Sequence, residues 1–270
     1  MRIAVTGASG LVGRFLTRGL AAAGHEVHTL PGWRLGQPAP LDGCAALVHA
    51  AFAHVPGKYR GGEGDDPARF LALNGDGKRR LFDDEQRAGV GRVVFLSSRA
   101  VYDALPAGTP LPDGTEAAPE SLYGRVKAEA EAELTARTAP VFTGASLRAT
   151  GIYGPGPDHK WQSLFTDYLS GRPVAPRRST ELHGDDLTAA VLLLLASRET
   201  GSFNASDLLL DRHDLLAEVA QLTGCPHAPP PRSEAKVSVM TCERLTALGW
   251  RPGGWDALSA SLPQMLSDGA

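Results

Sequence analysis

Cysteine is scarce in this sequence, and its distribution excludes two kinds of site. The chain has three cysteines, with neither the even number nor the close spacing of a disulfide framework or a zinc site: Cys44, Cys225 and Cys242. We expect these residues to be reduced thiols, and we expect no metal site.

Long hydrophobic runs are also missing. The longest apolar run, Ala189–Ala196, is far shorter than the ~20 residues that a helix needs to cross a bilayer. The opening segment Met1–Gly7 is too short an apolar run for the hydrophobic region of a secretory signal. We therefore expect a cytoplasmic protein that does not bind membranes.

Neither sign of charge dominates the chain. It contains 27 Lys and Arg residues against 30 Asp and Glu residues, a formal net charge of −3, and no block of basic residues. Proteins that bind nucleic acids neutralise the phosphate backbone with clustered Lys and Arg. A nucleic-acid partner is therefore not expected, and the partner that we expect is a small-molecule substrate.

The first half of the sequence alternates short β-rich runs with helical stretches. This alternation predicts an α/β fold of the Rossmann type, a doubly wound parallel sheet with helices on both faces. Strands are expected at Arg2–Thr6, Glu26–Leu30, Ala45–Ala50, Arg92–Ser97 and Phe142–Arg148, with a clipped strand at Trp33–Leu35. Helices are expected at Gly10–Ala23, Asn74–Ala88 and Tyr123–Ala136.

Beyond Gly151 the pattern loosens into loops rich in Pro and Gly. Helices are expected at Trp161–Ser170, Asp186–Ser197, Asp211–Thr223 and Thr241–Leu248, and a stiff extended connector at Gly224–Arg232. We expect residues 1–150 to form a dinucleotide-binding Rossmann domain. Residues 151–270 are expected to form mostly a small α/β substrate-binding lobe, with segments that return to the Rossmann core.

The segment Thr6–Gly13 reads TGASGLVG and lies between the first expected strand and the first expected helix. Its three glycines permit a tight turn and let the backbone approach a pyrophosphate, and the N–H groups and positive dipole end of the helix attract the phosphate charge. A plain glycine-rich turn is the alternative. The position directly after a strand and before a helix favours a dinucleotide site.

The choice between NAD and NADP depends on the end of the second expected strand. Dinucleotide-binding folds usually carry an acidic residue there, ~20 residues after the glycine loop, to bind the adenosine ribose. The segment Thr29–Arg34 contains no acid. Arg34 can pair with the 2′-phosphate of NADP instead, or it is a solvated surface arginine. The sequence leaves both cofactors open, with a weak lean to NADP.

Tyr123 and Lys127 stand four residues apart at the start of an expected helix, which places both on one face. A lysine cation beside a tyrosine lowers the pKa of the phenol from ~10, so that the phenol can exchange a proton with a hydroxyl or a carbonyl oxygen. An amphipathic surface turn is the alternative. Ser98 favours the catalytic interpretation, because it ends an apolar strand at the edge where a cleft forms and can bind the reacting oxygen.

Several motifs follow one another in a fixed order. They are Thr6–Gly13, Val48–Ala51, Ser97–Tyr102, Tyr123–Lys127, Leu147–Gly156 and His183–Leu187. With these motifs the chain resembles the extended short-chain dehydrogenases/reductases of the NAD-dependent epimerase/dehydratase family. The segment Gly249–Pro252 resembles the closing segment of that family.

The resemblance implies a role for residues in each motif. It implies that Ser98, Tyr123 and Lys127 are catalytic. It implies that the cofactor is bound by the glycine loop and the ends of the strands: Gly7, Ser9, Gly10, Leu11, Val12, Gly13, Ala50, Ala51, Ser97, Tyr123, Lys127, Thr150 and Ile152. It implies that the substrate contacts Phe52, Ser98, Arg99, Tyr123 and Arg178.

Other polar residues have a structural explanation at least as good as a catalytic one. Asn74 matches an asparagine that opens a helix in the family, and a helix N-cap explains it equally well. His49 is expected in the core, and His183 in the closure of the small lobe onto the sheet. A loop near the expected substrate entrance is polar, as exposed loops are: His54, Lys58, Tyr59 and Arg60.

Departures from the family pattern narrow the chemistry. Members that dehydrate nucleotide sugars carry an Asp-Glu pair after the catalytic hydroxyl, whereas this chain has Arg99 and Ala100, so elimination of water lacks its acid and base. Gly151 stands where nucleotide-sugar enzymes commonly have asparagine, which weakens the case for such substrates. Arg177 and Arg178 bind a phosphate or carboxylate, or form a solvated basic turn.

The leading prediction is an NAD(P)-dependent oxidoreductase that interconverts an alcohol and a ketone on a sugar, a sugar nucleotide or a secondary metabolite. An epimerase with tightly held NAD is the enzymatic alternative, and a regulator that binds NAD(P) without turnover is the alternative from another class. Similar proteins often dimerise through the helices near Asn74 and Tyr123. The charged run from Lys78 to Glu85 leaves a monomer and a homodimer both open.

Overall fold

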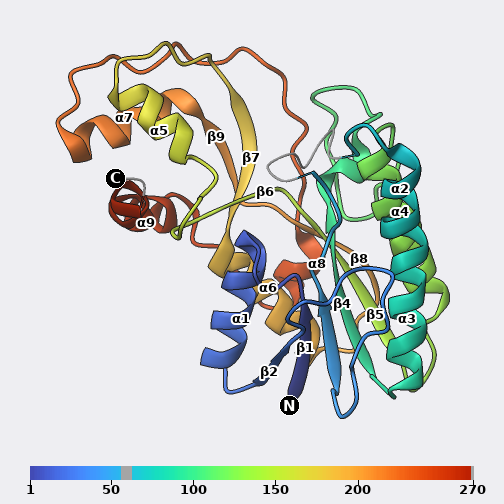
Figure 1. Ribbon diagram of the computed structural model, residues 1–270. Helices are drawn as coiled ribbons and strands as arrows, with labels where there is room; N and C mark the ends of the chain where they lie inside the picture. The colour runs from blue at the N-terminus through green and yellow to red at the C-terminus, as the bar shows by residue number, and fades with distance from the viewer. Residues whose placement is uncertain (56–62, 269–270) are drawn as a thin grey trace.

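A six-stranded parallel sheet forms the centre of the molecule, in the order β2-β1-β3-β4-β5-β8 (Figure 1). The computed structural model describes residues 1–55 and 63–268. The strands are β1 (Arg2–Thr6), β2 (Glu26–Thr29), β3 (Ala46–His49), β4 (Arg92–Ser98), β5 (Thr143–Ala149) and β8 (Gly201–Ala205). All six therefore end at one edge, called the carboxyl edge below. The predicted doubly wound α/β fold is confirmed.

Helices cover both faces of this sheet because successive side chains of a strand point to opposite faces. Ile3 and Val5 of β1 face one core, and Ala4 faces the other. The first core is covered by α1 (Leu11–Ala22), α6 (Gly184–Ala196) and α8 (Glu243–Ala247). The second core is covered by α3 (Gly77–Arg87) and α4 (Leu122–Ala136).

A small lobe is built on a second sheet, of three strands in the order β6-β7-β9. These strands are β6 (Gly151–Tyr153), β7 (Arg178–His183) and β9 (Leu208–Asp211). Three helices enclose a separate core with them: α5 (Gln162–Leu169), α7 (Arg212–Thr223) and α9 (Gly254–Asp268). Because β6 begins two residues after β5 ends, the small lobe lies at the carboxyl edge of the central sheet (Figure 1).

The clipped strand expected at Trp33–Leu35 is wrong. This segment forms two consecutive turns, in which Trp33 donates its N–H to the Leu30 carbonyl and Gln37 donates to the Arg34 carbonyl. Gly32 and Gly36 have φ values of +77° and +90°, in the left-handed region that glycine tolerates and that ends a strand. The chain therefore passes from β2 to β3 without another strand.

The helix expected to begin at Asn74 begins earlier. Asp66 caps its first turn by accepting the Arg69 N–H at 2.9 Å, and Pro67 takes the first helical position. The helix runs through α2 (Pro67–Leu71) and a π-helical turn, η1 (Ala72–Asp76), into α3. Asn74 lies in the π-helical turn, so its interpretation as an N-cap is wrong.

A buried ion pair links α4 to the central sheet. Arg148 of β5 and Glu131 of α4 approach to 2.6 Å, with 8% and 5% of their side chains exposed. The hydroxyls of Ser97 on β4 and Ser202 on β8 also donate to Glu131. One carboxylate therefore joins α4 to three adjacent strands.

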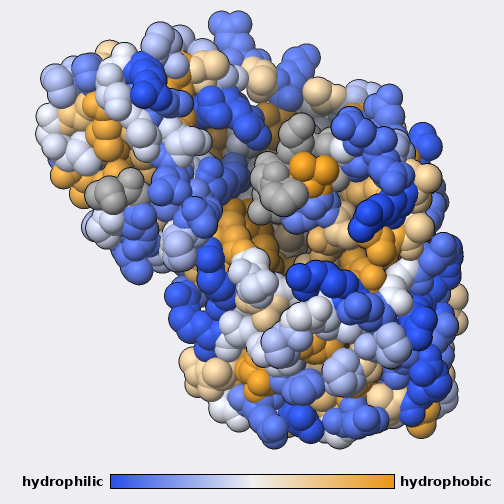
Figure 2. Space-filling view, viewed as in Figure 1, coloured by the Kyte–Doolittle hydropathy of each residue, from blue (hydrophilic) through white to orange (hydrophobic). Residues whose placement is uncertain are grey.

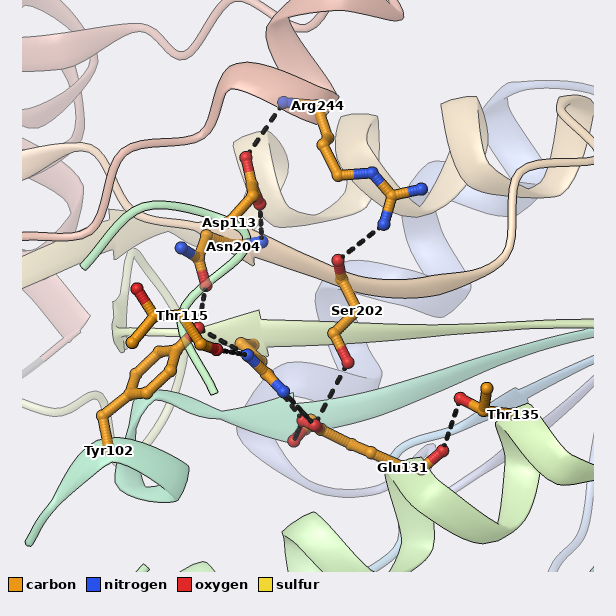
Figure 3. Close-up of polar contacts among 10 residues, drawn as sticks. Tyr102, Asp113, Thr115, Glu131, Thr135, Ser202, Asn204 and Arg244 are labelled. Carbon is orange, nitrogen blue, oxygen red and sulfur yellow. Dashed lines mark hydrogen bonds and ion pairs between the residues drawn. The ribbon is translucent and has the colours of Figure 1, made fainter. Parts of the chain in front are cut away.

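The guanidinium of Arg148 extends the network to Tyr102, and Asn204, Asp113 and Arg244 continue it (Figure 3). It donates to the Tyr102 hydroxyl at 2.6 Å, and this hydroxyl donates to Asn204. Tyr102 belongs to η2 (Arg99–Tyr102), a short 3-10 helix after β4. Asp113 accepts the backbone N–H groups of Asn204 and Arg244, which ties α8 to the same network.

Glu131→Gln should destabilise the fold by about 3 kcal/mol, because breaking a buried ion pair leaves the partner charge without compensation. The exposed pair Arg18–Asp185 provides the control, since both of its side chains are more than half exposed. Arg18→Ala should cost under about 1 kcal/mol. Urea denaturation of the two variants measures both free energies of unfolding, and equal values would contradict this account of the network.

Candidate active site

The loop between β1 and α1 packs against the end of β3. Gly7 has a φ of +72°, and a Cβ on this residue would lie 2.7 Å from the Ala51 nitrogen. A Cβ on Gly13 would overlap the Gly7 carbonyl oxygen. Both positions therefore exclude a side chain, which explains the glycines at the first and last of the three positions.

The same loop leaves backbone donors for an anion. Gly10 precedes α1, and no side chain caps the helix, so the N–H groups of its first turn remain available. Ser9 and Gly10 are exposed at the tip of the loop, Leu11 is half-buried and Val12 packs against the first core. This arrangement fits the pyrophosphate of a dinucleotide.

Thr6 holds the glycine loop to the neighbouring strand. Its hydroxyl lies 2.6 Å from His49 Nδ1 and accepts the Ala51 N–H at 3.2 Å. Ala50 and Ala51 therefore lie at the carboxyl edge beside Gly7. His49 itself is fully buried and stacks on Phe95 at 5.6 Å, so the structure places it in the core.

Arg34 lies in the second turn after β2 and is exposed. Its guanidinium donates to the carbonyl of Trp33 at 3.2 Å, and its own N–H donates to Gln37. No hydrogen bond or ion pair of the described residues joins Arg34 to the glycine loop. The hydrogen bonds of Arg34 thus stay within its own turn.

The first turn of α4 packs directly on the segment that follows Ser98. Ser121 caps the helix by accepting the Gly124 N–H at 3.0 Å, and Asp103 accepts hydrogen bonds from Ser121 in turn. A Cβ on Gly124 would overlap the carbonyl oxygen of Ala100. Glycine at this position therefore lets the helix turn that carries Tyr123 approach η2.

A second contact holds α4 just before Ser98. The Lys127 amine donates to the Leu96 carbonyl at 2.6 Å, while Gly124 touches Ala100. Ser98 lies between these two points on the chain, so the turn of α4 that carries Tyr123 and Lys127 lies alongside it. The three predicted catalytic residues thus meet at the carboxyl edge of the sheet.

Aromatic rings enclose the amine of Lys127. The Phe52 ring meets the Tyr123 ring edge to face at 4.9 Å, and Lys127 Nζ lies 4.8 Å from the centre of the Phe52 ring and 5.7 Å from that of Tyr123. Only 4% of Lys127 is exposed. Burial lowers the pKa of Lys127 to about 7, although the charge of Glu131 opposes this effect.

This arrangement can move a proton. An ammonium on Lys127 stabilises a phenolate on Tyr123, and the half-buried Ser98 hydroxyl, which accepts the Ala100 N–H at 3.2 Å, can donate to a substrate oxygen. The hydroxyl of Thr150, at the end of β5, is buried and has no hydrogen-bond partner in the described part of the chain. Together with the glycine loop, this unused donor fits a bound dinucleotide, with Ile152 two residues further along.

Three predicted site residues have other surroundings than the sequence suggested. The hydroxyl of Ser97 donates to Glu131, in the buried network. The guanidinium of Arg99 donates to the Ser238 carbonyl at 2.9 Å. Arg178 is exposed at the start of β7, and the neighbouring cavity is lined by Arg177 instead. Lys58, Tyr59 and Arg60 lie outside the described residues.

His183 caps α6 and links two segments of the chain. Its Nδ1 accepts the Asp185 N–H at 3.2 Å, and its Nε2 lies 3.0 Å from the Ser261 hydroxyl of α9. The residue joins the helix that covers the central sheet to a helix of the small lobe. This contact agrees with the structural role expected from the sequence.

Asn74 positions the loop that carries Phe52. Its amide nitrogen donates to the Ala53 carbonyl at 2.8 Å, and its amide oxygen accepts the Ala53 N–H at 3.0 Å. The side chain thus holds the backbone one residue after Phe52, at the wall of the site. The π-helical turn directs Asn74 inwards, and a plain helical period does not predict this turn.

The small lobe contains a cavity of about 190 Å³ that the sequence did not predict. Its lining includes the polar residues Lys160, Ser163, Arg177, Ser179, Glu181 and Arg212. Lys160 and Glu181 form an ion pair, and Ser179 donates to Glu181 at 2.8 Å.

Gly151 makes room for this ion pair. A Cβ on Gly151 would overlap the Lys160 amine and would lie 2.6 Å from Glu181 Oε2. The pair therefore occupies the space that a side chain at position 151 would need.

A hollow separates the small lobe from the central sheet, and hydrophobic residues are visible at its floor (Figure 2). The glycine loop, Ser98 and Thr150 all belong to the carboxyl edge that faces this side. The small lobe joins the sheet there through the step from β5 to β6. A cofactor on the sheet and a substrate from the lobe would therefore meet beside Tyr123.

Comparison with known proteins agrees with this geometry. A model of the NAD dependent epimerase/dehydratase family matches residues 3–205. A 3-beta-hydroxysteroid dehydrogenase/Delta 5→4-isomerase of Mycobacterium tuberculosis is 28% identical over 235 residues, which cover 71% of this chain and 61% of that protein. The chain thus spans less than two thirds of the length of this relative.

Two further matches extend over almost the whole chain. A probable dTDP-4,6-dihydroxy-2-methyloxan-3-one 4-ketoreductase of Streptomyces antibioticus is 30% identical, and the match covers 99% of this chain and 96% of that protein. The crystal structure of the UDP-glucose 4-epimerase of Thermus thermophilus in complex with NAD has a TM-score of 0.78 at 24% identity. It covers 98% of this chain and 99% of its own, and it shows the same fold.

Replacing Gly10 or Gly13 by alanine should distinguish a glycine that contacts the cofactor from a glycine that is needed for the packing of the loop. A Cβ on Gly10 meets only the Gly7 oxygen, at 3.5 Å, whereas one on Gly13 overlaps that atom. The free energy of unfolding of Gly10→Ala, measured in urea, should lie within about 0.5 kcal/mol of the wild-type value. The substitution should still weaken NAD(P)H binding at least ~10-fold, about 1.4 kcal/mol, because the backbone there approaches the pyrophosphate.

Gly13→Ala should lower both stability and NAD(P)H affinity. Nicotinamide fluorescence measures the affinity of each variant. If Gly10→Ala bound the cofactor as tightly as the wild type, the pyrophosphate would not lie over Gly10.

Proposed function

The chain belongs to the NAD-dependent epimerase/dehydratase family, whose members are NAD(P)-dependent oxidoreductases and epimerases, and we propose that this member is an oxidoreductase. It interconverts an alcohol and a ketone on a sugar, a sugar nucleotide or a secondary metabolite. The observation that carries the proposal is the packing of Tyr123 and Lys127 alongside Ser98 at the carboxyl edge.

Each catalytic residue has one task in this reaction. A nicotinamide cofactor held by the glycine loop and Thr150 would supply the hydride acceptor or donor for the carbon of the substrate. Tyr123 takes the hydroxyl proton as the alcohol becomes a ketone, or returns a proton to the carbonyl oxygen in the reverse direction. Ser98 donates to the same oxygen, and the Lys127 ammonium stabilises the phenolate. Phe52 keeps water from the Tyr123–Lys127 pair.

Elimination of water is not part of the proposal. The residues after Ser98 are Arg99, whose guanidinium donates to Ser238, and Ala100, whose carbonyl touches α4. Neither supplies the acid or the base that a dehydratase needs at this position. Hydride and proton transfer without elimination therefore account for the residues present.

We also propose that the cavity of the small lobe binds an anionic group of the substrate. Among its lining residues, Lys160, Arg177 and Arg212 carry positive charge and only Glu181 carries negative charge. Arg212 lines the cavity, and its guanidinium donates to the Ala175 carbonyl at 3.0 Å. A phosphate or a carboxylate would balance the excess of positive charge.

In this proposal the two parts of the chain bind different molecules. Residues 1–150 bind the cofactor, and residues 151–270 bind the substrate, while β8 and α6 return to the central sheet. A cytoplasmic location is proposed because NAD(P)-dependent turnover draws on the intracellular cofactor pool. Among residues 1–55 and 63–268, no helix is long and apolar enough to cross a membrane.

An epimerase that holds NAD through its cycle is the second candidate, since it uses the same phenol and ammonium. A sensor without turnover is a third, and it has no use for an amine buried against the phenol. The cofactor found on the purified protein separates the first two.

Tyr123→Phe should lose turnover by about 10³-fold, because the ring still packs on Phe52 but no longer exchanges a proton. NAD(P)H affinity should stay within about 2-fold. Tyr168→Phe is the matched control, since that phenol donates to the His227 carbonyl in the small lobe. The assay is the change in nicotinamide absorbance with an accepted carbonyl substrate, and wild-type turnover in Tyr123→Phe would contradict the mechanism.

Arg177→Ala should raise the KM for an anionic substrate about 10-fold, equivalent to about 1.4 kcal/mol, with little change in kcat, because this contact is the same in the ground state and the transition state. Arg178→Ala, at an exposed neighbouring position outside the cavity, should leave the KM unchanged. Steady-state kinetics at saturating cofactor distinguishes the two variants. An equal effect of both would contradict the assignment of the cavity.

A further inference from the structure

Lys78 is a buried amine that the proposed mechanism does not use. Only 1% of this residue is exposed, and it lies on the inner face of α3. Its amine donates to the Val126 carbonyl of α4 at 3.0 Å. Val126 immediately precedes Lys127, so Lys78 is attached to the helix turn that carries the catalytic pair.

The two amines share one aromatic enclosure. Lys78 Nζ lies 5.1 Å from the centre of the Phe95 ring and 5.8 Å from that of Phe52. Lys127 Nζ lies 4.9 Å and 4.8 Å from the same two rings. Both cations are therefore desolvated against the same apolar side chains.

No carboxylate of the described residues forms an ion pair with Lys78 or Lys127. Glu131, four residues after Lys127 in α4, is bound to Arg148. A buried ammonium without a carboxylate partner is costly, and two ammonium groups in one enclosure also repel each other.

The other titratable groups that face the two amines do not remove this cost. The charges of Glu129 and Glu133 on α4 oppose the lowering of the Lys78 pKa by burial, but neither carboxylate forms an ion pair with Lys78. His49 of β3 is fully buried, and burial together with the two lysines lowers its pKa well below its usual value. His49 is therefore neutral and supplies no charge of either sign.

The pKa values follow from this environment. Burial lowers the pKa of Lys78 well below its usual value, and the charge of Lys127 lowers it further. Burial lowers the pKa of Lys127 to about 7. Because the two amines share one enclosure, a charge on either amine disfavours a charge on the other.

We propose that Lys78 is a positioning residue for Lys127, and that the two amines hold a single proton between them in the enclosure formed by Phe52 and Phe95. Lys78 acts through Lys127: a proton held on Lys78 is withheld from Lys127, and the ammonium that supports the Tyr123 phenolate is lost. Lys78 thereby sets the pH range in which Tyr123 exchanges protons. The catalytic consequence rests on the proposed function, whereas the sharing of the proton does not.

The proton sharing can be measured without turnover. The sequence contains only five lysines, so the side-chain signals of isotopically labelled lysine can be assigned by substitution. In the cofactor-free wild type, Lys127 should titrate in two steps more than ~1 pH unit apart. In Lys78→Met, which keeps an apolar chain of similar length, Lys127 should titrate in one step.

Two further variants control this experiment. Arg80→Met removes a positive charge from the exposed face of α3 and should leave the Lys127 curve unchanged. Lys127→Met should move the titration of Lys78 to higher pH, because the competing charge is gone. Lys127 curves that coincide in the wild type and Lys78→Met would overturn the sharing of the proton.

The pH profile of kcat tests the positioning role separately. In Lys78→Met, the pH profile of kcat should change in steepness, and its midpoint should shift by at least ~0.5 pH unit. This shift should have the same direction as the shift of the Lys127 titration curve. If the lysine titration curves changed but the pH profile of kcat did not, the positioning role of Lys78 would be overturned. The sharing of the proton would still be supported. Absence of turnover in every variant, with coupled lysine curves, would instead count against the proposed function alone.

Discussion

The ion pair between Glu131 and Arg148 determines where helix α4 lies, and the catalytic geometry follows from that position. Glu131 joins α4 to β5 directly and to β4 and β8 through serine hydroxyls. One turn earlier, Lys127 binds the Leu96 carbonyl, and one turn before that Gly124 touches Ala100. The helix is thus fixed along its length, and with it the turn that carries Tyr123. The cost of burying these charges is offset only because the network satisfies them together.

Short-range patterns were sufficient to predict the central sheet, and they also indicated the residues of the proposed catalytic site. β1, α1 and the glycine loop follow from apolar periodicity and glycine spacing, and Ser98 and Tyr123 follow from their place at strand and helix ends. The small lobe could not be predicted in the same way, because β6 has three residues and β9 has four, too few for a period to show. The clipped strand at Trp33–Leu35 failed because Gly32 and Gly36 turn the chain twice.

The burial of Lys78 beside α4 could not be predicted from the sequence. Lys78 stands in a run of charged residues, which favours a solvated helix face. In the structure the helical period divides that run, so that Lys78, Asp84 and Glu85 are buried while Arg79 and Arg80 are exposed. Only the packing of α3 against α4 brings the Lys78 amine to the catalytic helix. Gly151 is a similar case, since the ion pair beside it comes from residues distant in sequence.

The central claim is that this fold binds a nicotinamide cofactor and uses it for redox chemistry. It is tested most directly by titrating the purified protein with NADH and NADPH, reading nicotinamide fluorescence and first identifying any cofactor that is already bound. Saturable binding of at least one reduced cofactor, with no retained NAD+, is the predicted result. Tightly retained NAD+ would favour the epimerase, and a protein that bound neither cofactor would contradict the account.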